Sequence, residues 1–211
     1  MIRRVVWIGG CTRRYTTTTT ATTGSAAKKE TPLTPTQFES IQEMLRVDQA
    51  GELAADAIYR GQLFALKETS PMKPLIQHMW DQEKHHRVIL DTLCANNRVR
   101  PSVLSPVWYG MGFALGAGTA LLGEKAAMMC TEVVEEVIGV HYNDQIRELV
   151  KIPDNESAQT LAQVIKVLRD EELEHRTHAL QHDAKQAPLY DPLSFIIRTG
   201  CQGAIWVASR F

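Results

Sequence analysis

The sequence predicts an all-α fold, a bundle of four long helices with two additional apolar helices. Beyond Thr36 the apolar residues recur at helical spacing nearly everywhere, and strand-like alternation is scarce. A proline, whose missing N–H costs nothing in a first helical turn, stands near most expected helix starts. These prolines are Pro35, Pro71, Pro106, Pro153 and Pro192. The predicted helices span residues 36–68, 71–96, 106–122, 124–150, 155–187 and 191–209.

The chain divides into a short basic segment and one larger domain. Its 211 residues, 44% of them hydrophobic, suffice for one well-buried core and give no sign of two equal domains. Residues 1–29 hold six arginine and lysine side chains and no acid, and they are rich in threonine. This composition is typical of a mitochondrial presequence, which we expect to be cleaved from the domain at 30–211. A disordered basic tail is the alternative.

Charge and cysteine content exclude some classes of function. Without the basic segment, 17 basic side chains remain against 24 acidic ones, a balance that argues against a nucleic-acid partner. The four cysteines are scattered and form no paired spacing. A reducing compartment therefore fits better than a disulfide-stabilised scaffold.

At the start of the fifth helix, we expect Asp154 to act as the N-terminal cap.

An internal repeat places the same chemical groups on two helical hairpins. The segments DQEKHH (81–86) and DEELEH (170–175) share Asp, Glu and His in the same register, 89 residues apart. Each segment lies on the helix that follows one with a glutamate and a tyrosine seven positions later. These pairs are Glu52 with Tyr59 and Glu135 with Tyr142. The sequence thus predicts two hairpins that carry equivalent side chains.

Helical phase places these groups inside the bundle. Seven residues make almost two helical turns, so Glu52 and Glu135 each share a helix face with their tyrosine and with the apolar residues of that face. The neighbouring Glu136 lies on another stripe, together with Glu132, and we expect that stripe to face solvent. In each repeated segment Glu and His stand three residues apart on an apolar face, which is where they would meet the other hairpin.

Burying four glutamates and two histidines at one level requires cations, because desolvation and mutual repulsion would otherwise cost many kcal/mol. Two divalent metals would neutralise the four carboxylates. The predicted ligands are Glu52, Glu83, His86, Glu135, Glu172 and His175. A Glu from each of two helices with Glu-x-x-His from each of the other two is the ligand set of ferritin-like di-iron carboxylate proteins. Iron or manganese suits this oxygen-rich set better than zinc.

Alternatives remain for single features. One isolated Glu-x-x-His copy would be an ordinary structural pair or a surface feature, and only the doubled set points to a metal. Tyr59 and Tyr142 would either hydrogen-bond the ligand carboxylates or bond unrelated partners in the core. His141 lies off the Glu135 face by about a third of a turn, so both a structural role and a proton-relay role stay open.

At these residues the sequence closely resembles the demethoxyubiquinone hydroxylase family, the di-iron monooxygenases of ubiquinone biosynthesis. The matching segments are LRVDQAGE (45–52), MWDQEKHH (79–86), GFALGAGTALLG (112–123), HYNDQI (141–146) and RDEELEH (169–175). The resemblance covers about residues 36–211, and it implies iron ligands at the six positions already selected by helical phase.

The resemblance also implies an activity. The expected reaction hydroxylates the ring of a polyprenylated demethoxy quinone in the penultimate step of the pathway, with O2 as co-substrate and electrons from NADH. It implies peripheral association with the matrix side of the inner mitochondrial membrane and a lipid-binding protein partner from the same pathway. A membrane-associated quinol oxidase and a ferroxidase or other iron-binding bundle would use the same ligands and remain alternatives. A lipid-binding helical scaffold without activity is a further alternative.

Residues 101–123 carry no charge and are long enough to cross a bilayer. A crossing would leave Glu52, Glu83 and His86 on one side of the membrane and the other three ligands on the opposite side. We therefore expect an apolar helix that lies in one leaflet, with a buried core helix as the alternative. The last helix, at 191–209, would add a second membrane-facing surface or pack on the bundle as a lid.

Overall fold

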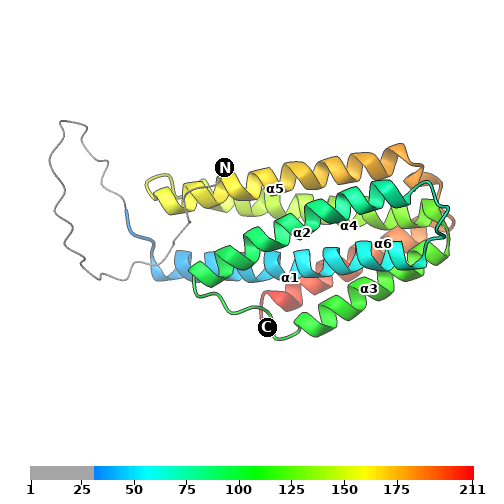
Figure 1. The fold of residues 1–211 in the computed structure, drawn as a ribbon. Helices are drawn as coiled ribbons and strands as arrows, with labels where there is room; N and C mark the ends of the chain where they lie inside the picture. The colour runs from blue at the N-terminus through cyan, green and yellow to red at the C-terminus, as the bar shows by residue number, and fades with distance from the viewer. Residues whose placement is uncertain (1–30) are drawn as a thin grey trace.

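The computed structural model describes residues 31–211, which form six α-helices, one short 3-10 helix and no strand (Figure 1). The elements are α1 (Pro35–Ala65), α2 (Lys73–Asn96), α3 (Ser105–Leu121), α4 (Glu124–Leu149), α5 (Glu156–Gln181), η1 (Ala184–Gln186) and α6 (Tyr190–Ala208). The prediction of an all-α helical bundle is confirmed. The predicted presequence lies outside the described residues, so that segment and the boundary at residue 30 stay predictions.

Both ends of the fifth helix differ from the predicted ones. Asn155, not Asp154, caps α5, because its side chain accepts a hydrogen bond of 2.8 Å from the Ala158 N–H. Both residue types cap well, so composition alone did not separate two adjacent candidates. At its other end α5 stops at Gln181 instead of 187. Asp183 has a φ of 63°, a left-handed conformation that interrupts the helix before η1 begins.

Local signals explain the start of the first helix. Thr34 accepts a hydrogen bond from the Gln37 N–H, and the Gln37 side chain accepts one from the Thr34 N–H. This reciprocal capping box satisfies two backbone donors that a helix start leaves unpaired, and Pro35 occupies the first turn. These contacts fix the N-terminal end of α1.

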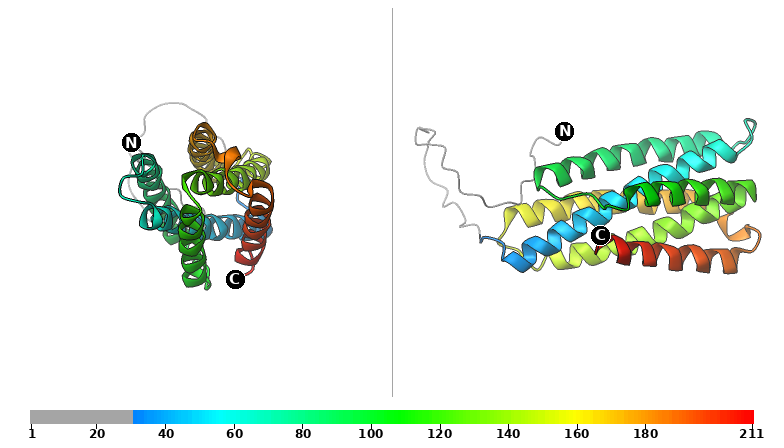
Figure 2. Two further views of the ribbon diagram at one scale, coloured as in Figure 1. Left: turned by 90° about the vertical axis from the view of Figure 1, so that its right-hand side faces the viewer. Right: turned by 90° about the horizontal axis from the view of Figure 1, so that it is seen from below.

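The helices form two hairpins that lie side by side. α1 packs against α2 and α4 packs against α5, while α1 and α4 have few close backbone approaches. α3 lies along α1, and α6 lies against α4, so each hairpin carries one additional helix (Figures 1 and 2). In Figure 2 most of the helices run roughly along one axis, and α1 crosses the others at an angle.

Glycines bring the backbones of α1 and α3 almost into contact. A Cβ added at Gly116 would stand 2.0 Å from the carbonyl oxygen of Ile58, and one added at Gly61 would stand 2.3 Å from that of Phe113. Real side chains cannot come so close, so only glycine fits at these two positions. The packing holds α3 in one register against α1.

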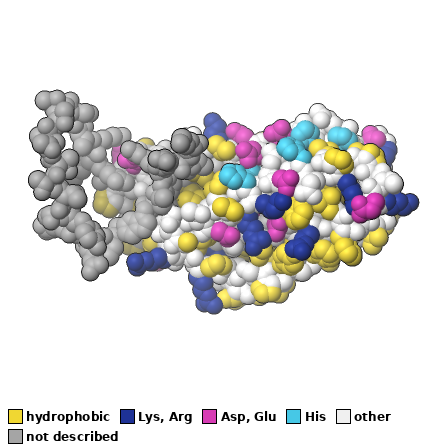
Figure 3. Space-filling view, in the orientation of Figure 1, with side chains coloured by type: hydrophobic (Ala, Val, Ile, Leu, Met, Phe, Trp, Pro, Cys, Tyr) yellow, Lys and Arg dark blue, Asp and Glu magenta, His cyan; other side chains and the backbone are white. Residues whose placement is uncertain are grey.

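The outer face of α3 is apolar and exposed. Val107, Met111 and Leu121 are 46%, 58% and 75% exposed. Figure 3 shows hydrophobic side chains along the lower edge of this face, among Lys and Arg, where α3 lies in Figure 1. Among residues 31–211 no helix combines the length and the apolar character that a membrane crossing requires.

Two of the three apolar clusters among the described residues fill the bundle and leave its middle level to polar groups. One cluster takes in residues 58–66 of α1 and 126–134 of α4, and the other takes in Ile41 and Leu45 of α1 with Leu149 of α4. On α1 and α4 the two clusters therefore flank Glu52 and Glu135. On α2 and α5 the two clusters are likewise separated by a stretch that belongs to neither. The four helices therefore present polar side chains at the same level along the bundle.

Candidate metal centre

The six predicted ligand side chains converge in the middle of the bundle. α1 and α4 each supply one glutamate, while α2 and α5 each supply a glutamate and a histidine three residues later. The six residues are Glu52, Glu83, His86, Glu135, Glu172 and His175, and none is more than 2% exposed. Their assignment as metal ligands remains a prediction, whereas their burial and proximity are properties of the fold.

These side chains form two overlapping groups. In each group every residue offers one ligand atom, and those atoms lie within 4.8 Å of one another. The groups are Glu52, Glu83, His86 and Glu172, and Glu83, Glu135, Glu172 and His175. Each contains three carboxylates and one imidazole. Because Glu83 and Glu172 belong to both, the geometry suits two neighbouring cations that share two carboxylates.

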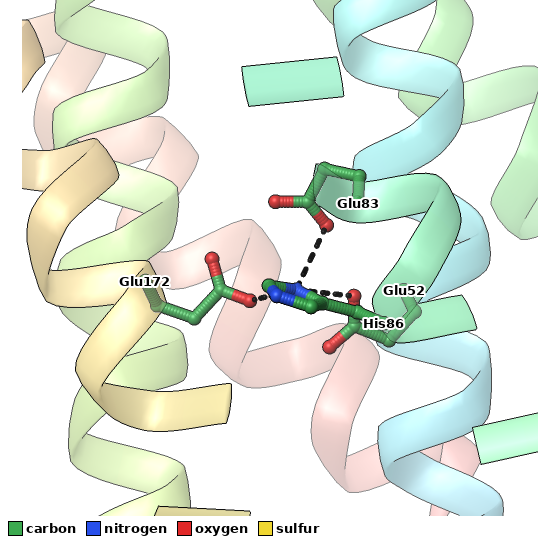
Figure 4. Close-up of side chains that lie close together, drawn as sticks. All are labelled: Glu52, Glu83, His86 and Glu172. Atoms are coloured by element: carbon green, nitrogen blue, oxygen red, sulfur yellow. Dashed lines mark ion pairs between the residues drawn. The ribbon is translucent and has the colours of Figure 1, made fainter. Parts of the chain in front are cut away.

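The imidazoles turn their Nδ1 atoms toward the carboxylates. His86 Nδ1 lies 3.0 Å from Glu172 Oε1 and 3.7 Å from Glu52 Oε2. Figure 4 shows Glu52, Glu83 and Glu172 around this ring, with dashed lines from His86 to each. His175 Nδ1 lies 3.1 Å from both Glu83 Oε1 and Glu172 Oε2. Nδ1 is thus the inward atom of both histidines.

Unsatisfied atoms show that the residues fit bound cations. Six buried atoms of these side chains take part in no hydrogen bond: Glu52 Oε2, Glu83 Oε1 and Oε2, His86 Nδ1, Glu135 Oε2 and Glu172 Oε1. A buried polar atom without a partner costs about 1–3 kcal/mol, and more when it is charged. All six atoms can donate a lone pair to a cation. A pair of divalent ions would therefore satisfy them together.

Protons partly neutralise the centre when cations are absent. Burial raises the pKa of Glu83 and of Glu135 well above the ordinary value, and the neighbouring Glu172 carboxylate raises both further. Burial opposes a charge on His86, but the nearby Glu172 and Glu52 carboxylates outweigh it and raise the pKa of this imidazole to about 11. Without cations, these shifts favour the protonated forms of Glu83, Glu135 and His86.

The two tyrosines cross between the hairpins in a reciprocal arrangement. The Tyr59 hydroxyl on α1 donates a hydrogen bond of 2.8 Å to Glu135 Oε1 on α4. The Tyr142 hydroxyl on α4 donates one of 2.5 Å to Glu52 Oε1 on α1. The sequence analysis left open whether these tyrosines bond the predicted ligand carboxylates or unrelated partners, and the structure shows hydrogen bonds to the carboxylates. Each bond fixes one oxygen of its glutamate and leaves the other free to face the centre.

His141 lies outside the cluster of six. Its Nε2 atom is 3.3 Å from Asp48 Oδ1 and 2.9 Å from the side-chain nitrogen of Gln145. Gln145 in turn donates a hydrogen bond of 2.7 Å to Asp48, which is buried on α1. This polar group ties α4 to α1 one turn away from Glu52. The contacts give His141 a structural partner and do not test a proton-relay role.

Glu132 contradicts the prediction of a solvent-facing stripe. It is fully buried, and its carboxylate accepts hydrogen bonds from Tyr190 at 2.7 Å and Lys185 at 3.2 Å. Its stripe neighbour Glu136 is half-buried and accepts a bond of 2.8 Å from Arg198. The last part of the chain, η1 and α6, covers this face of α4. Helical periodicity within α4 carries no information about a later segment that packs on it.

A buried carboxylate that the sequence analysis missed connects α1 to α2. Asp56, one turn after Glu52, accepts hydrogen bonds from Trp80 Nε1 at 2.6 Å and Arg87 at 2.8 Å. Trp80 precedes Glu83 by three residues, and Arg87 follows His86 directly. The cross-link therefore joins α1 to α2 beside Glu52, Glu83 and His86. In the sequence, the position of Asp56 four residues after Glu52 could have indicated this contact, because residues four apart are neighbours on the surface of a helix.

Comparisons with known proteins match most of the chain to one family. The family model described as "Ubiquinone biosynthesis protein COQ7" matches residues 39–208. The chain is 52% identical over 172 residues to a Rattus norvegicus protein named "NADPH-dependent 3-demethoxyubiquinone 3-hydroxylase, mitochondrial", covering 82% of this chain and 78% of the rat protein. It is 45% identical over 196 residues to the Saccharomyces cerevisiae "5-demethoxyubiquinone hydroxylase, mitochondrial", covering 87% and 84% of the two chains.

A bacterial relative extends the match beyond mitochondria. The Rhodospirillum rubrum protein named "3-demethoxyubiquinol 3-hydroxylase" is 45% identical over 184 residues, covering 87% of this chain and 84% of its own length. The matched region spans α1 through α6 and includes all six side chains of the centre. On this evidence the chain belongs to the family of the ubiquinone biosynthesis protein COQ7.

Proposed function

We propose that this chain is a monooxygenase that hydroxylates the ring of a polyprenylated demethoxy quinone or quinol in ubiquinone biosynthesis. The observation that carries the proposal is the buried centre, in which six side chains from four helices leave six ligand-competent atoms without a hydrogen bond. The printed names of the rat, yeast and bacterial relatives support the substrate class. The ligand set supports a ferritin-like arrangement of α1, α2, α4 and α5.

We assign two iron ions to the centre. The proposed ligands are Glu52, Glu83, His86, Glu135, Glu172 and His175, with Glu83 and Glu172 shared between both positions. The chemistry that iron supplies when bound is the activation of O2, so that one oxygen atom enters the ring and the other leaves as water. Oxygen-rich coordination with one imidazole per position suits iron better than zinc.

The chain's own residues prepare the centre for this reaction. The Tyr59 and Tyr142 hydroxyls each hold one oxygen of Glu135 and Glu52, which keeps these carboxylates oriented without further rearrangement. The apolar clusters on either side of the centre exclude water. Exclusion of water protects the reaction from the loss of reactive oxygen to solvent.

The electron balance requires a two-electron donor. Insertion of one oxygen atom from O2 and release of the other as water consumes two electrons and two protons, which one reduced nicotinamide with a proton supplies. The sequence analysis predicts NADH, whereas the name of the rat relative prints NADPH. We propose a reduced nicotinamide as the source, and a comparison of the two under identical conditions decides which one serves this chain.

We further propose a peripheral position on the matrix side of the inner mitochondrial membrane. The basic, acid-free composition of residues 1–29 supports a cleaved presequence, and the rat and yeast relatives are named mitochondrial. The exposed apolar side chains of α3, together with Phe195, Ile196 and Trp206 of α6, support contact with a lipid surface. A lipid-binding protein of the same pathway is the proposed partner.

The mass of the quinone tests the proposed reaction. Iron-loaded protein in lipid vesicles is incubated with a demethoxy quinone, O2 and either NADH or NADPH, and the product is analysed by mass spectrometry. A gain of one oxygen atom, labelled when 18O2 is used, is the expected result. Quinol oxidation without this gain would instead indicate a quinol oxidase. Iron oxidation with the quinone unchanged would indicate a ferroxidase, and no change in either would indicate a scaffold.

A further inference from the structure

The two histidines of the centre are held from behind by different groups. His86 Nε2 lies 2.5 Å from Glu171 Oε2, and His175 Nε2 lies 3.0 Å from Gln82 Oε1. Glu171 and Gln82 are not among the proposed ligands. One histidine is therefore backed by a carboxylate and the other by a neutral amide.

The two contacts are related by the internal repeat. Gln82 directly precedes Glu83, and Glu171 directly precedes Glu172, in segments 89 residues apart. Each backing residue stands on one hairpin and reaches the histidine of the other, from α2 to α5 and from α5 to α2. The fold thus repeats the contact, but the backing residue is a carboxylate in one copy and a neutral amide in the other.

Both contacts fix the same tautomer. A carboxylate oxygen and an amide oxygen accept hydrogen bonds, so the Nε2 atom of each ring carries the hydrogen. The lone pair then lies on Nδ1, which faces the carboxylates at 3.0 Å in His86 and 3.1 Å in His175. In this respect both backing residues prepare a ligand nitrogen equally well.

They differ in how strongly they polarise the ring. A hydrogen bond to an ionised acceptor is roughly twice as strong as one between neutral groups, and it makes the imidazole a better electron donor. The two ligand groups themselves have the same composition. Both ligand groups contain three carboxylates and one imidazole, and each unshared carboxylate, Glu52 or Glu135, accepts one tyrosine hydrogen bond.

We propose that Glu171 and Gln82 are positioning residues that make the two metal positions unequal, so that the position served by His86 binds a divalent cation more tightly than the one served by His175. The inference rests on the proposed metal centre and adds to it an order of filling. Replacement of groups that orient a metal-bound histidine typically changes metal affinity by about 10- to 100-fold. For a charge difference alone, we expect about tenfold, at the lower end of that range.

Stepwise titration of the metal-free full chain with Co2+ tests this inference. Cobalt absorption in the visible range reports occupancy, and competition with a chelator yields two dissociation constants. The wild-type constants should differ by about tenfold. Glu171→Gln should weaken the tighter step by about this factor and leave the other step in place, so that the two constants converge. Gln82→Glu should tighten the weaker step.

Two sets of variants serve as controls. Glu174→Gln removes one negative charge from the same helix at a side chain that is 59% exposed and faces His178, so both steps should keep their wild-type constants. His86→Ala should remove the tighter step and His175→Ala the weaker one, which assigns the steps to positions. Circular dichroism checks that every variant is folded.

The outcomes separate this inference from the proposed function. Wild-type protein that takes up no cobalt would overturn the metal centre and the inference with it. Two bound ions per chain, with constants that Glu171→Gln changes no more than Glu174→Gln does, would overturn only the inference. Loss of the tighter step in His175→Ala would also overturn it, because the order of filling would then be reversed.

Discussion

Tyr142 on α4 donates a hydrogen bond of 2.5 Å to Glu52 on α1, between two helices with few close backbone approaches. Both side chains are about 1–2% exposed, so water does not replace either group of the pair. The bond connects the hairpins at the level of the proposed metals. It does so together with its counterpart from Tyr59 to Glu135.

We expect Tyr142→Phe to lower the free energy of unfolding of the metal-free protein by about 1–3 kcal/mol, because a buried carboxylate oxygen loses its donor. Urea unfolding followed by circular dichroism measures the change. Tyr109→Phe is the matched control, since the Tyr109 hydroxyl forms only an exposed hydrogen bond with Arg60. Its effect should stay within about 0.5 kcal/mol. Equal effects of the two variants would contradict the buried bond.

A second prediction separates adjacent glutamates on α4. Glu135→Ala should reduce the number of bound iron ions from two per chain to one, because it removes a carboxylate that only one ligand group uses. Glu136→Ala should leave both ions bound, since Glu136 pairs with Arg198. Metal analysis of iron-loaded, desalted protein measures the counts. The same loss in both variants would mean that the helical phase assigned to α4 is wrong.

Metal binding should release protons and strengthen as pH rises. The raised pKa values of Glu83, Glu135 and His86 favour protonation of these groups in the metal-free centre, and cations must displace the protons. Calorimetric titration with Fe2+ under anaerobic conditions, in two buffers of different ionisation enthalpy, counts the released protons. A binding constant that stays the same between about pH 6 and pH 8 would refute this prediction.

The same shifts give the metal-free protein an unusual pH dependence of stability. For Glu83 and Glu135 the folded pKa lies above the ordinary value of 4.5, and for His86 it rises from 6.5 to about 11. The folded state therefore binds more protons than the unfolded chain, so stability falls as pH rises above about 4.5 for the acids and through 6.5 to 11 for His86. Glu172, whose pKa is also raised, acts in the same direction, whereas Glu52 and His175, whose pKa values are lowered, act in the opposite one.

Urea midpoints measured from about pH 6 to pH 9 check this dependence. We expect the metal-free midpoint to decrease over this range and the iron-loaded midpoint to change much less, because bound cations take the place of the protons. Metal-free midpoints that increase with pH would contradict the sign of the shifts.

A further prediction concerns the glycines between α1 and α3. Gly116→Ala should destabilise the protein by about 1–3 kcal/mol, because the new methyl group would meet the Ile58 backbone and force α3 away. Gly118→Ala, two residues away with nothing within 4 Å of the added Cβ, should be neutral or stabilising by up to about 1 kcal/mol. Thermal unfolding of both variants provides the comparison. If Gly118→Ala proved the more harmful, the proposed backbone contact would be wrong.

The sequence predicted the parts of the centre that helical phase controls. Glu52 and Glu135 lie seven residues before tyrosines on apolar faces, and the fold buries both glutamates as that spacing requires. Periodicity works here because each helix of the bundle hides a single stripe, and a polar residue within that stripe stands out.

Contacts between elements distant in sequence were not predictable in this way. Glu132 is buried because η1 and α6 pack over it, and nothing within α4 signals that covering. Glu171 reaches His86 across the hairpins although it is itself partly exposed, at 37%. Asp183 ends α5 through its own backbone conformation, a local choice that apolar spacing does not record.

Each of the two ligand groups draws on both hairpins, since Glu172 of α5 joins Glu52, Glu83 and His86, and Glu83 of α2 joins the other set. The proposed metal centre therefore lies on the seam between the two hairpins and draws ligands from both. Without ions, protons on the buried acids and the hydrogen bonds from Tyr59 and Tyr142 hold this seam together. Ions at the proposed positions would therefore join the two hairpins, and we expect metal-loaded protein to resist proteolysis longer than metal-free protein.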